Sequence, residues 1–113
     1  MKISVVISTY NGEKYVIEQL DSIKKQTRKP DEVIIKDDCS TDCTVQIIKN
    51  YIAENHLIKS WKLIENEDNM GWRKNFVELL KLATGDLVFL CDQDDIWMPE
   101  KVEKMSQIFL KNE

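Results

Sequence analysis

The sequence lacks the features that would assign it to several large functional classes. No apolar run approaches the roughly 20 residues that a membrane-spanning helix needs, and the N-terminal apolar stretch is too short for a secretory signal. There is no Gly-x-Gly-x-x-Gly motif and no Gly-Lys-Ser/Thr loop, which disfavours dinucleotide and P-loop nucleotide binding. We therefore expect a cytoplasmic protein outside both of these nucleotide-binding classes.

Cysteine and histidine are also scarce. The chain has three cysteines, an odd number that fits a reducing compartment better than a disulfide framework. Cys39 and Cys43 lie close in sequence, but there is no second cysteine pair and the only histidine, His56, is distant. A zinc site is therefore not expected. His56 is also expected at the far end of a helix, which leaves no nucleophile–histidine pair for covalent catalysis.

Basic charge is scarce as well. The net charge is −4 over 113 residues and no basic stripe stands out, so a nucleic-acid-binding surface is not expected. Lys24, Lys25, Arg28 and Lys29 do cluster, but we interpret them as the solvated end of a helix. Hydrophobic residues make up 42% of the chain and charged residues 32%, which is typical of a globular protein. A chain of this length forms one domain with one core.

The hydrophobic pattern alternates between strands and helices along the chain. Runs of β-branched and apolar residues predict strands at 3–8, 32–36, 61–65 and 87–91, the third nearest a sheet edge because it is the least apolar. Amphipathic spacing predicts helices at 13–29, from Ser40 or Thr41 to 55, at 72–83 and at 100–111. This order predicts a Rossmann-like α/β fold, with a mostly parallel sheet and helices on both faces.

Polar clusters follow three of the predicted strands. Residues 8–11 follow the first strand, Asp37 and Asp38 the second, and residues 92–95 the fourth, while segment 66–75 is expected to reach the same edge. The carboxyl ends of parallel strands share one edge of a sheet, where α/β proteins bind their ligands. We therefore predict a single site at this edge.

The densest cluster is acidic. Asp92, Asp94 and Asp95 place three carboxylates within four positions, where like charges repel. A hard divalent cation, Mg²⁺ or Mn²⁺, would remove this repulsion by accepting oxygen ligands. The alternative is an acidic loop that caps the helix beginning near Pro99.

The surrounding residues fit a phosphorylated ligand held through such a metal. The metal would neutralise the charge that develops on a departing diphosphate, and Arg73 with Lys74 would assist the phosphates. Asp38 would repel phosphate, so it suits a hydrogen-bond donor such as a base imide N–H or a sugar hydroxyl. Tyr10 either lies along a base ring or only packs.

Four motifs in this sequence resemble those of the family 2 glycosyltransferases, which have the A-type glycosyltransferase fold. They are residues 4–11, residues 37–44, Asn69-Met70-Gly71 with Asn75, and residues 85–99, which include Asp92-Gln93-Asp94-Asp95-Ile96-Trp97. The likeness covers about residues 2–104. The last motif is similar to that of bacterial enzymes that make surface polysaccharide, rhamnosyltransferases among them.

The resemblance implies transfer of a sugar from a nucleotide-diphosphate donor to an acceptor hydroxyl, with inversion at the anomeric carbon. It implies that Ser8, Thr9 and Tyr10 line the nucleoside pocket and that Asp38 accepts from a pyrimidine imide. The expected donor-binding residues are Ser8, Thr9, Tyr10, Asp38, Asn69, Gly71, Arg73 and Asn75, although Asn69 and Asn75 alternatively only close a loop. The expected ligands of Mn²⁺ or Mg²⁺ are Asp92, Asp94 and Asp95, with Asp94 the most direct.

The resemblance also implies partners and a location. The donor is expected to be a UDP- or dTDP-sugar, the acceptor a glycan or lipid-linked glycan, and the pathway the synthesis of polysaccharide or cell-surface glycan. No nucleic-acid partner is expected. The cytoplasmic location allows for peripheral association with the inner face of the cell membrane through segments outside this chain, and an exposed apolar face would allow a homodimer.

Two departures from the family pattern bear on these expectations. Cys39 stands where the family has Gly or another turn-tolerant residue, so we expect strain in the loop after Asp38. No carboxylate in the chain matches the downstream catalytic base that inverting transfer needs. We therefore expect residues 1–113 to be one donor-binding domain, truncated before the acceptor-binding half and inactive alone. The alternatives are a non-catalytic nucleotide-sugar-binding or regulatory module, and a receiver-like signalling domain, which the position of the acidic cluster disfavours.

Overall fold

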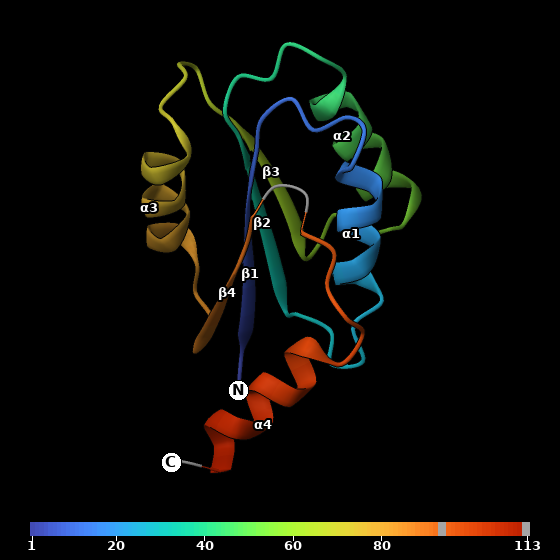
Figure 1. The fold of residues 1–113 in the computed structure, drawn as a ribbon, viewed down its shortest axis with the longest axis vertical. Coiled ribbons are helices and arrows are strands. Elements are labelled where there is room, and N and C mark those ends of the chain that lie inside the picture. The colour runs from blue at the N-terminus through green and yellow to red at the C-terminus, as the bar shows by residue number, and fades with distance from the viewer. Residues whose placement is uncertain (93–94, 112–113) are drawn as a thin grey trace.

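The computed structural model describes residues 1–92 and 95–111, which form a parallel sheet between helices (Figure 1). The strands are β1 (Ile3–Thr9), β2 (Glu32–Asp37), β3 (Trp61–Glu65) and β4 (Leu87–Cys91). The helices are α1 (Val16–Lys24), α2 (Thr44–Glu54), α3 (Trp72–Leu82) and α4 (Lys101–Lys111). The predicted alternation of strands and helices is confirmed.

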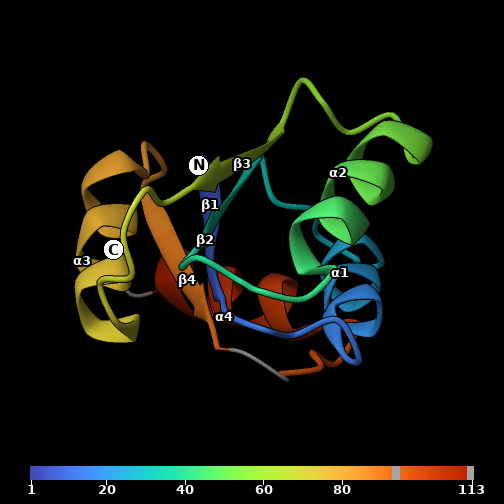
Figure 2. The same ribbon diagram turned by 90° about the horizontal axis from the view of Figure 1, so that it is seen from above.

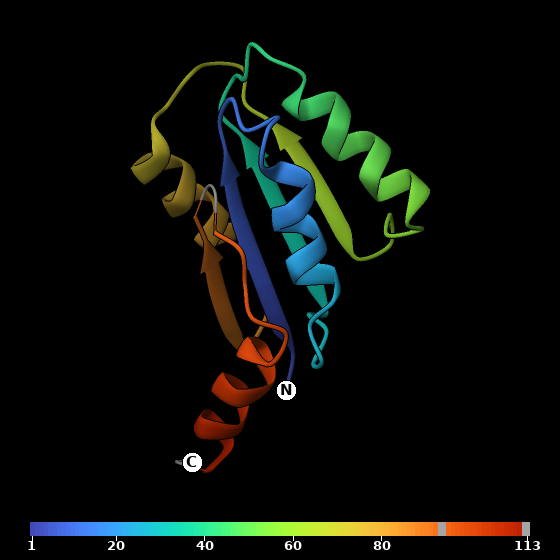
Figure 3. The ribbon, with the colours of Figure 1, turned by 45° about the vertical axis from the view of Figure 1, so that its right-hand side comes forward.

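The strand order positions a site at one edge of the sheet. All neighbouring strands are parallel, and their order is β3-β2-β1-β4. The chain therefore builds outward from β1 to β3 and then returns to place β4 on the other side of β1. Figure 3 shows the strands side by side with their carboxyl ends at the top. Ligands of such sheets bind beyond this edge, where the strand order reverses between β1 and β4.

Helices cover both faces of the sheet, as predicted (Figure 2). On one face, α1 and α2 pack against inward side chains that include Val5 and Val33. On the other face, α3 places Phe76 and Leu79 against Val6 and Ile34. Because both faces of β1 and β2 are buried, these strands are nearly continuously apolar rather than alternating.

The predicted start of the second helix was wrong. α2 begins at Thr44, beyond the expected N-caps Ser40 and Thr41. The hydroxyl and backbone N–H of Ser40 instead donate to the buried carboxylate of Asp37, at 2.7 and 2.9 Å. The carboxylate of Asp42 accepts from the backbone N–H of Thr44 at 3.0 Å. Ser40, which the sequence predicted as an N-cap, therefore stabilises the turn that precedes α2.

Only part of α4, the helix predicted at 100–111, is buried. Val102 is buried, but Met105 and Phe109 are 43% and 52% exposed. Figures 1 and 3 show that the helix, which begins at Lys101 just after Pro99, extends past the lower end of the sheet. Its buried residues, Val102 and Ser106, lie in its first two turns. None of the helices within the described residues is long and apolar enough to cross a membrane.

α2 ends in a Schellman motif that carries an unusual residue. The N–H of Leu57 donates to the carbonyl of Ile52 at 3.0 Å, and the N–H of His56 donates to that of Ala53 at 3.2 Å. His56 takes the left-handed position of this motif, with φ 56°. Glycine usually occupies that position because a Cβ clashes with the backbone there.

We predict that His56→Gly stabilises the chain. Removing the Cβ removes its clash with the backbone in the left-handed conformation. The free energy of unfolding should rise by about 1 kcal/mol, because this gain exceeds the entropic cost of ordering a glycine. Chemical denaturation of both proteins measures this difference. His56→Ala is the matched control and should not stabilise, because alanine keeps the Cβ. A loss of stability in His56→Gly would contradict the prediction.

Candidate functional site

A cleft of about 580 Å³ opens at the carboxyl ends of β1, β2 and β4. It lies at the edge where the strand order reverses, as expected for an α/β sheet. Its lining combines acidic, amide and aromatic side chains with the backbone of the loop that precedes α3. The lining residues are Ser8, Tyr10, Asp38, Asn69, Gly71, Trp72, Phe76 and Asp92.

Asp38 is the most heavily bonded side chain of this cleft. Its Oδ1 accepts from the backbone N–H of Met70 at 2.8 Å and from the amide of Asn66 at 3.1 Å, and its Oδ2 accepts from the N–H of Gly71 at 2.9 Å. Burial acts to raise the pKa of Asp38, but these hydrogen bonds and the charge of Lys36 outweigh it and hold the pKa below its usual range. Asp38 is therefore ionised at neutral pH.

The bonding of Asp38 leaves limited capacity for a ligand. Each carboxylate oxygen accepts about two hydrogen bonds, so Oδ1 is full and Oδ2 has one position left. Asp38 thus ties the end of β2 to the loop before α3 and still offers one acceptor to the cleft. The expected contact with a base imide or sugar hydroxyl stays a prediction that this geometry permits.

A buried amide network lies beneath the cleft. Asn75 is fully buried, and its Nδ2 donates to the Ser8 hydroxyl oxygen at 2.7 Å and to the carbonyl of Lys36 at 2.8 Å. Its Oδ1 accepts from Asn66 at 2.8 Å, and the ammonium of Lys36 donates to the Oδ1 of Asn66. Asn75 is therefore placed to hold the cleft from below rather than to line it.

Two other predicted residues are also placed outside the lining. Thr9 is buried, and its hydroxyl donates to Asp37 at 2.7 Å. The guanidinium of Arg73 lies 5.3 Å from the ring of Trp72 at the start of α3. Asn69 does line the cleft and donates to the carbonyl of Asp38 at 3.3 Å. Roles for Thr9 and Arg73 in donor binding stay predictions.

The loop after Asp38 has the strained backbone that we expected from a cysteine in place of glycine at position 39. Cys39 has φ 62°, in the left-handed region that favours glycine. Its thiol contacts the carbonyl of Asn66 at 3.3 Å. Burial, followed by the neighbouring carboxylates, raises the pKa of the Cys39 thiol above its usual value, so the thiol stays protonated at neutral pH.

The acidic segment begins directly after β4, which ends at the buried Cys91. Asp92 and Asp95 are exposed, and the Oδ2 of Asp95 accepts from the N–H of Asp92 at 3.2 Å. Within residues 1–92 and 95–111, no three His, Cys, Asp or Glu side chains are grouped to hold a metal ion. The predicted ligand Asp94 lies outside the described residues.

Sequence reasoning missed several side chains that build the site. Trp72 and Phe76 line the cleft, and the buried Gln19 of α1 donates to the carbonyl of Asp92, fixing the end of β4. Trp72 could have been found from its place directly after Gly71 at a helix start. Lys36 was also signalled, because a lysine in an otherwise apolar strand needs a buried partner.

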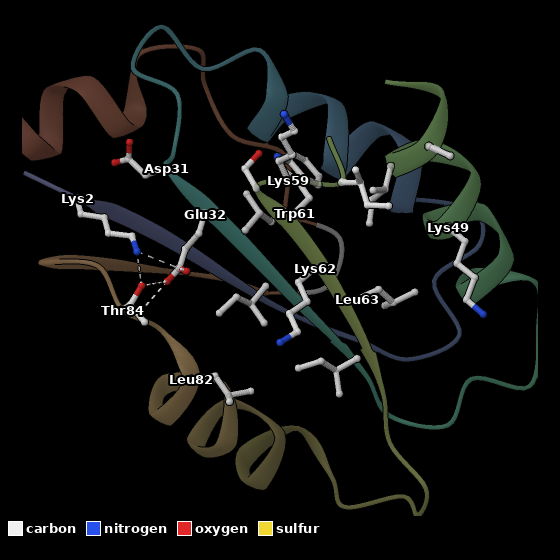
Figure 4. Close-up of a pocket in the computed structure, with 17 residues that line it drawn as sticks. Lys2, Asp31, Glu32, Lys49, Lys59, Trp61, Lys62, Leu63, Leu82 and Thr84 are labelled. Carbon is white, nitrogen blue, oxygen red and sulfur yellow. Dashed lines mark hydrogen bonds and ion pairs between the residues drawn. The ribbon is translucent and has the colours of Figure 1, made fainter. Parts of the chain in front are cut away.

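A second hollow, of about 830 Å³, runs along the outer edge of β3 (Figure 4). Lining side chains hydrogen-bond to one another near the amino ends of the strands. There the Thr84 hydroxyl donates to Glu32, and the Lys2 ammonium donates to Thr84. Lys59 and Lys62 lie along its length. None of the predicted site residues that the structure describes lines this hollow.

Comparison with known proteins assigns the family. The model of the family described as Glycosyl transferase family 2 matches residues 4–113. The chain belongs to this glycosyltransferase family. Among its relatives in this family, EpsE of Bacillus subtilis is 39% identical over 103 residues, which cover 91% of this chain and 36% of EpsE. The family assignment confirms the resemblance and is at odds with a receiver-like domain.

Solved structures of family relatives share the fold. TarS of Staphylococcus aureus, named a poly(ribitol-phosphate) β-N-acetylglucosaminyltransferase, is 42% identical over 97 residues, covering 84% of this chain but 16% of TarS. Its residues 1–349 in complex with UDP superpose with a TM-score of 0.85 at 38% identity, covering 98% of this chain and 32% of that one. The mannosyltransferase PcManGT from Pyrobaculum calidifontis, with GDP-Man and Mn²⁺, gives a TM-score of 0.76 at 31% identity, covering 85% and 28%.

We predict that Asp38→Asn destabilises this glycosyltransferase-family chain by about 2 kcal/mol at neutral pH. Asparagine replaces one acceptor oxygen with an NH₂ group that faces backbone donors. The difference should shrink below about pH 4. A carboxyl with a depressed folded pKa stabilises the fold above its unfolded pKa and loses that contribution as pH falls through the folded value.

Urea denaturation between pH 3 and pH 7 measures both effects. Asp68→Asn is the control, because Asp68 is an exposed aspartate of the same loop region. It should change stability little at any pH. Equal stabilities of the wild type and Asp38→Asn at pH 7 would show that the Asp38 hydrogen bonds do not hold this loop.

Proposed function

We propose that this chain binds the nucleotide-sugar donor of a glycosyl transfer, with a UDP- or dTDP-sugar as the donor. The observation that carries the proposal is the cleft itself. Asp38 and Tyr10 both line it, and the Oδ2 of Asp38 has one hydrogen-bond position left for a ligand. The family assignment supports sugar transfer, and the UDP complex of TarS supports a uridine nucleotide.

The base is proposed to lie at the Asp38 end of the cleft. The remaining position on Oδ2 accepts an imide N–H, which uracil and thymine both carry at the ring position next to two carbonyls. Tyr10 is 44% exposed and presents an aromatic ring on which a base can stack. The ionised Asp38 repels phosphate, so the diphosphate is directed toward the β4 end.

The acidic segment is proposed to hold Mn²⁺ or Mg²⁺ beside the diphosphate. Asp92 lines the cleft and Asp95 is exposed next to it, so both supply the hard oxygen ligands that these cations prefer. Asp94 remains part of the proposed ligand set by sequence. The bound cation neutralises charge on the departing nucleotide diphosphate. The Mn²⁺ in the PcManGT complex supports this assignment.

The wider reaction is also a proposal, because the chain spans only 36% of EpsE and 16% of TarS. We infer inverting transfer to a glycan or lipid-linked acceptor in polysaccharide or cell-surface glycan synthesis. The polymer in the name of TarS supports an acceptor of this class. The base that deprotonates the acceptor is proposed to lie outside residues 1–113, with the protein in the cytoplasm.

Calorimetric titration with UDP, dTDP and GDP, with and without Mn²⁺, tests the proposal. We expect the pyrimidine nucleotides to bind more tightly than GDP and to need the metal. The double variant Asp92→Asn/Asp95→Asn should lose at least about tenfold in metal-dependent affinity, since two anionic ligands become neutral.

Asp86→Asn is the matched control for this titration. Asp86 precedes the opposite end of the same strand, where it accepts from the N–H of Lys2, and it should not affect nucleotide binding. If no nucleotide binds the wild type under either condition, donor binding by this chain is refuted.

A further inference from the structure

We propose that Gln19 of α1 is a positioning residue for the metal of the donor cleft. It holds the backbone of Asp92 so that the carboxylates of Asp92 and Asp95 keep one arrangement before the cation binds. Gln19 does not line the cleft, so it acts through Asp92. The inference rests on the proposed function and adds a residue to its metal site.

Asp92 lies just beyond the sheet and needs an anchor. The register of β4 with β1 ends at Cys91, opposite Ile7. The backbone N–H of Asp92 donates to the Oδ2 of Asp95 at 3.2 Å, and the carbonyl of Asp92 accepts from the N–H of Asp95 at 3.2 Å. These two bonds join the aspartates to each other, but they do not tie the pair to the rest of the fold.

Gln19 supplies the missing tie. Its Nε2 donates to the carbonyl of Asp92 and lies 3.3 Å from the Sγ of Cys91. A carbonyl can only accept, so the NH₂ group of the Gln19 amide must face it. Among the hydrogen bonds between described residues, this one alone connects Asp92 or Asp95 with a residue outside segment 91–95.

The anchor itself is held firmly. Gln19 is 2% exposed and shares the buried face of α1 with Val16, Leu20 and Ile23. A buried amide costs free energy unless its polar atoms find partners, so an apolar side chain would fill this position at lower cost. The amide at this position instead reaches past the end of β4 to the first aspartate of the acidic segment.

This tie matters for a cation because the two carboxylates repel each other when no cation is bound. A segment without the tie would relieve the repulsion by moving the carboxylates apart, and cation binding would have to bring them back together. Residues that orient metal ligands from outside commonly contribute roughly 10- to 100-fold to metal affinity. Losing the Gln19 donor should therefore weaken the metal site without touching the part of the cleft that takes the base.

Chemical-shift titration of the ¹⁵N-labelled chain with UDP tests this role, once at a fixed Mg²⁺ concentration and once with EDTA in its place. The ratio of the two UDP affinities is the metal gain. Gln19→Met fills the same space but cannot donate, and it should lower the metal gain about tenfold while leaving the affinity in EDTA unchanged. A merely structural role would lower both affinities by the same factor and leave the metal gain unchanged.

Gln26→Met is the matched control. Gln26 follows α1, is 1% exposed and also donates to a backbone carbonyl, that of Met98 at 2.7 Å. The buried Trp97 lies between Met98 and the acidic residues in sequence and packs against Phe89, with 5.9 Å between the ring centroids. Because Trp97 holds this end of the segment independently, Gln26→Met should lower stability but keep the wild-type metal gain.

A measurement on the wild type covers the case in which Gln19→Met does not fold. The side-chain amide signals of Gln19 should shift when UDP and Mg²⁺ are added, because the cation draws electron density from Asp92. The side-chain amide signals of Gln26 should stay in place. Unchanged Gln19 signals at saturating UDP and Mg²⁺ would overturn the inference.

The outcomes separate this inference from the proposed function. A folded Gln19→Met that keeps the wild-type metal gain overturns the inference and leaves the proposed donor and metal site standing. A wild type that binds UDP equally with Mg²⁺ and with EDTA refutes the proposed metal site, and the inference with it. A wild type that binds UDP under neither condition refutes donor binding itself.

Discussion

The buried carboxylate of Asp38 is the interaction on which the site depends. It collects the backbone N–H groups of Met70 and Gly71 and the amide of Asn66, and so fastens the loop before α3 to the end of β2. Without this contact the aromatic and amide walls of the cleft would have no fixed position relative to β1. The same residue keeps one acceptor position open, so a structural tie and a binding group coincide in one side chain.

The sheet explains why these residues meet. The two hydrophobic clusters on opposite faces of the sheet fix the register of β1 and β2, because a slip by one residue would exchange the side chains that face each cluster. With the register fixed, Ser8, Asp38 and Asp92 all arrive at one edge where the strand order reverses. Gln19 then holds the β4 side from α1, while the Lys36 network holds the β2 side from below.

The fold was predictable from sequence to a greater depth than the site. Strand limits and helix order follow from apolar runs and helical spacing, which depend on local pattern. The start of α2 and the exposed half of α4 did not follow, because they depend on which polar group Asp37 binds and on where the sheet ends. Motifs placed Ser8, Tyr10 and Asp38 at one edge. They did not show that Thr9 turns toward Asp37, or that Trp72 lines the cleft, since those facts depend on side-chain direction.

The central claim is that the cleft between β1, β2 and β4 takes the nucleotide of the donor. Amide chemical-shift mapping of the ¹⁵N-labelled chain with UDP and Mg²⁺ tests it most directly. The account predicts the largest shifts at Tyr10, Met70, Gly71 and Asp92, with residues of the hollow along β3, such as Lys59 and Lys62, unchanged. Shifts centred on that hollow, or none at saturating UDP and Mg²⁺, would contradict it.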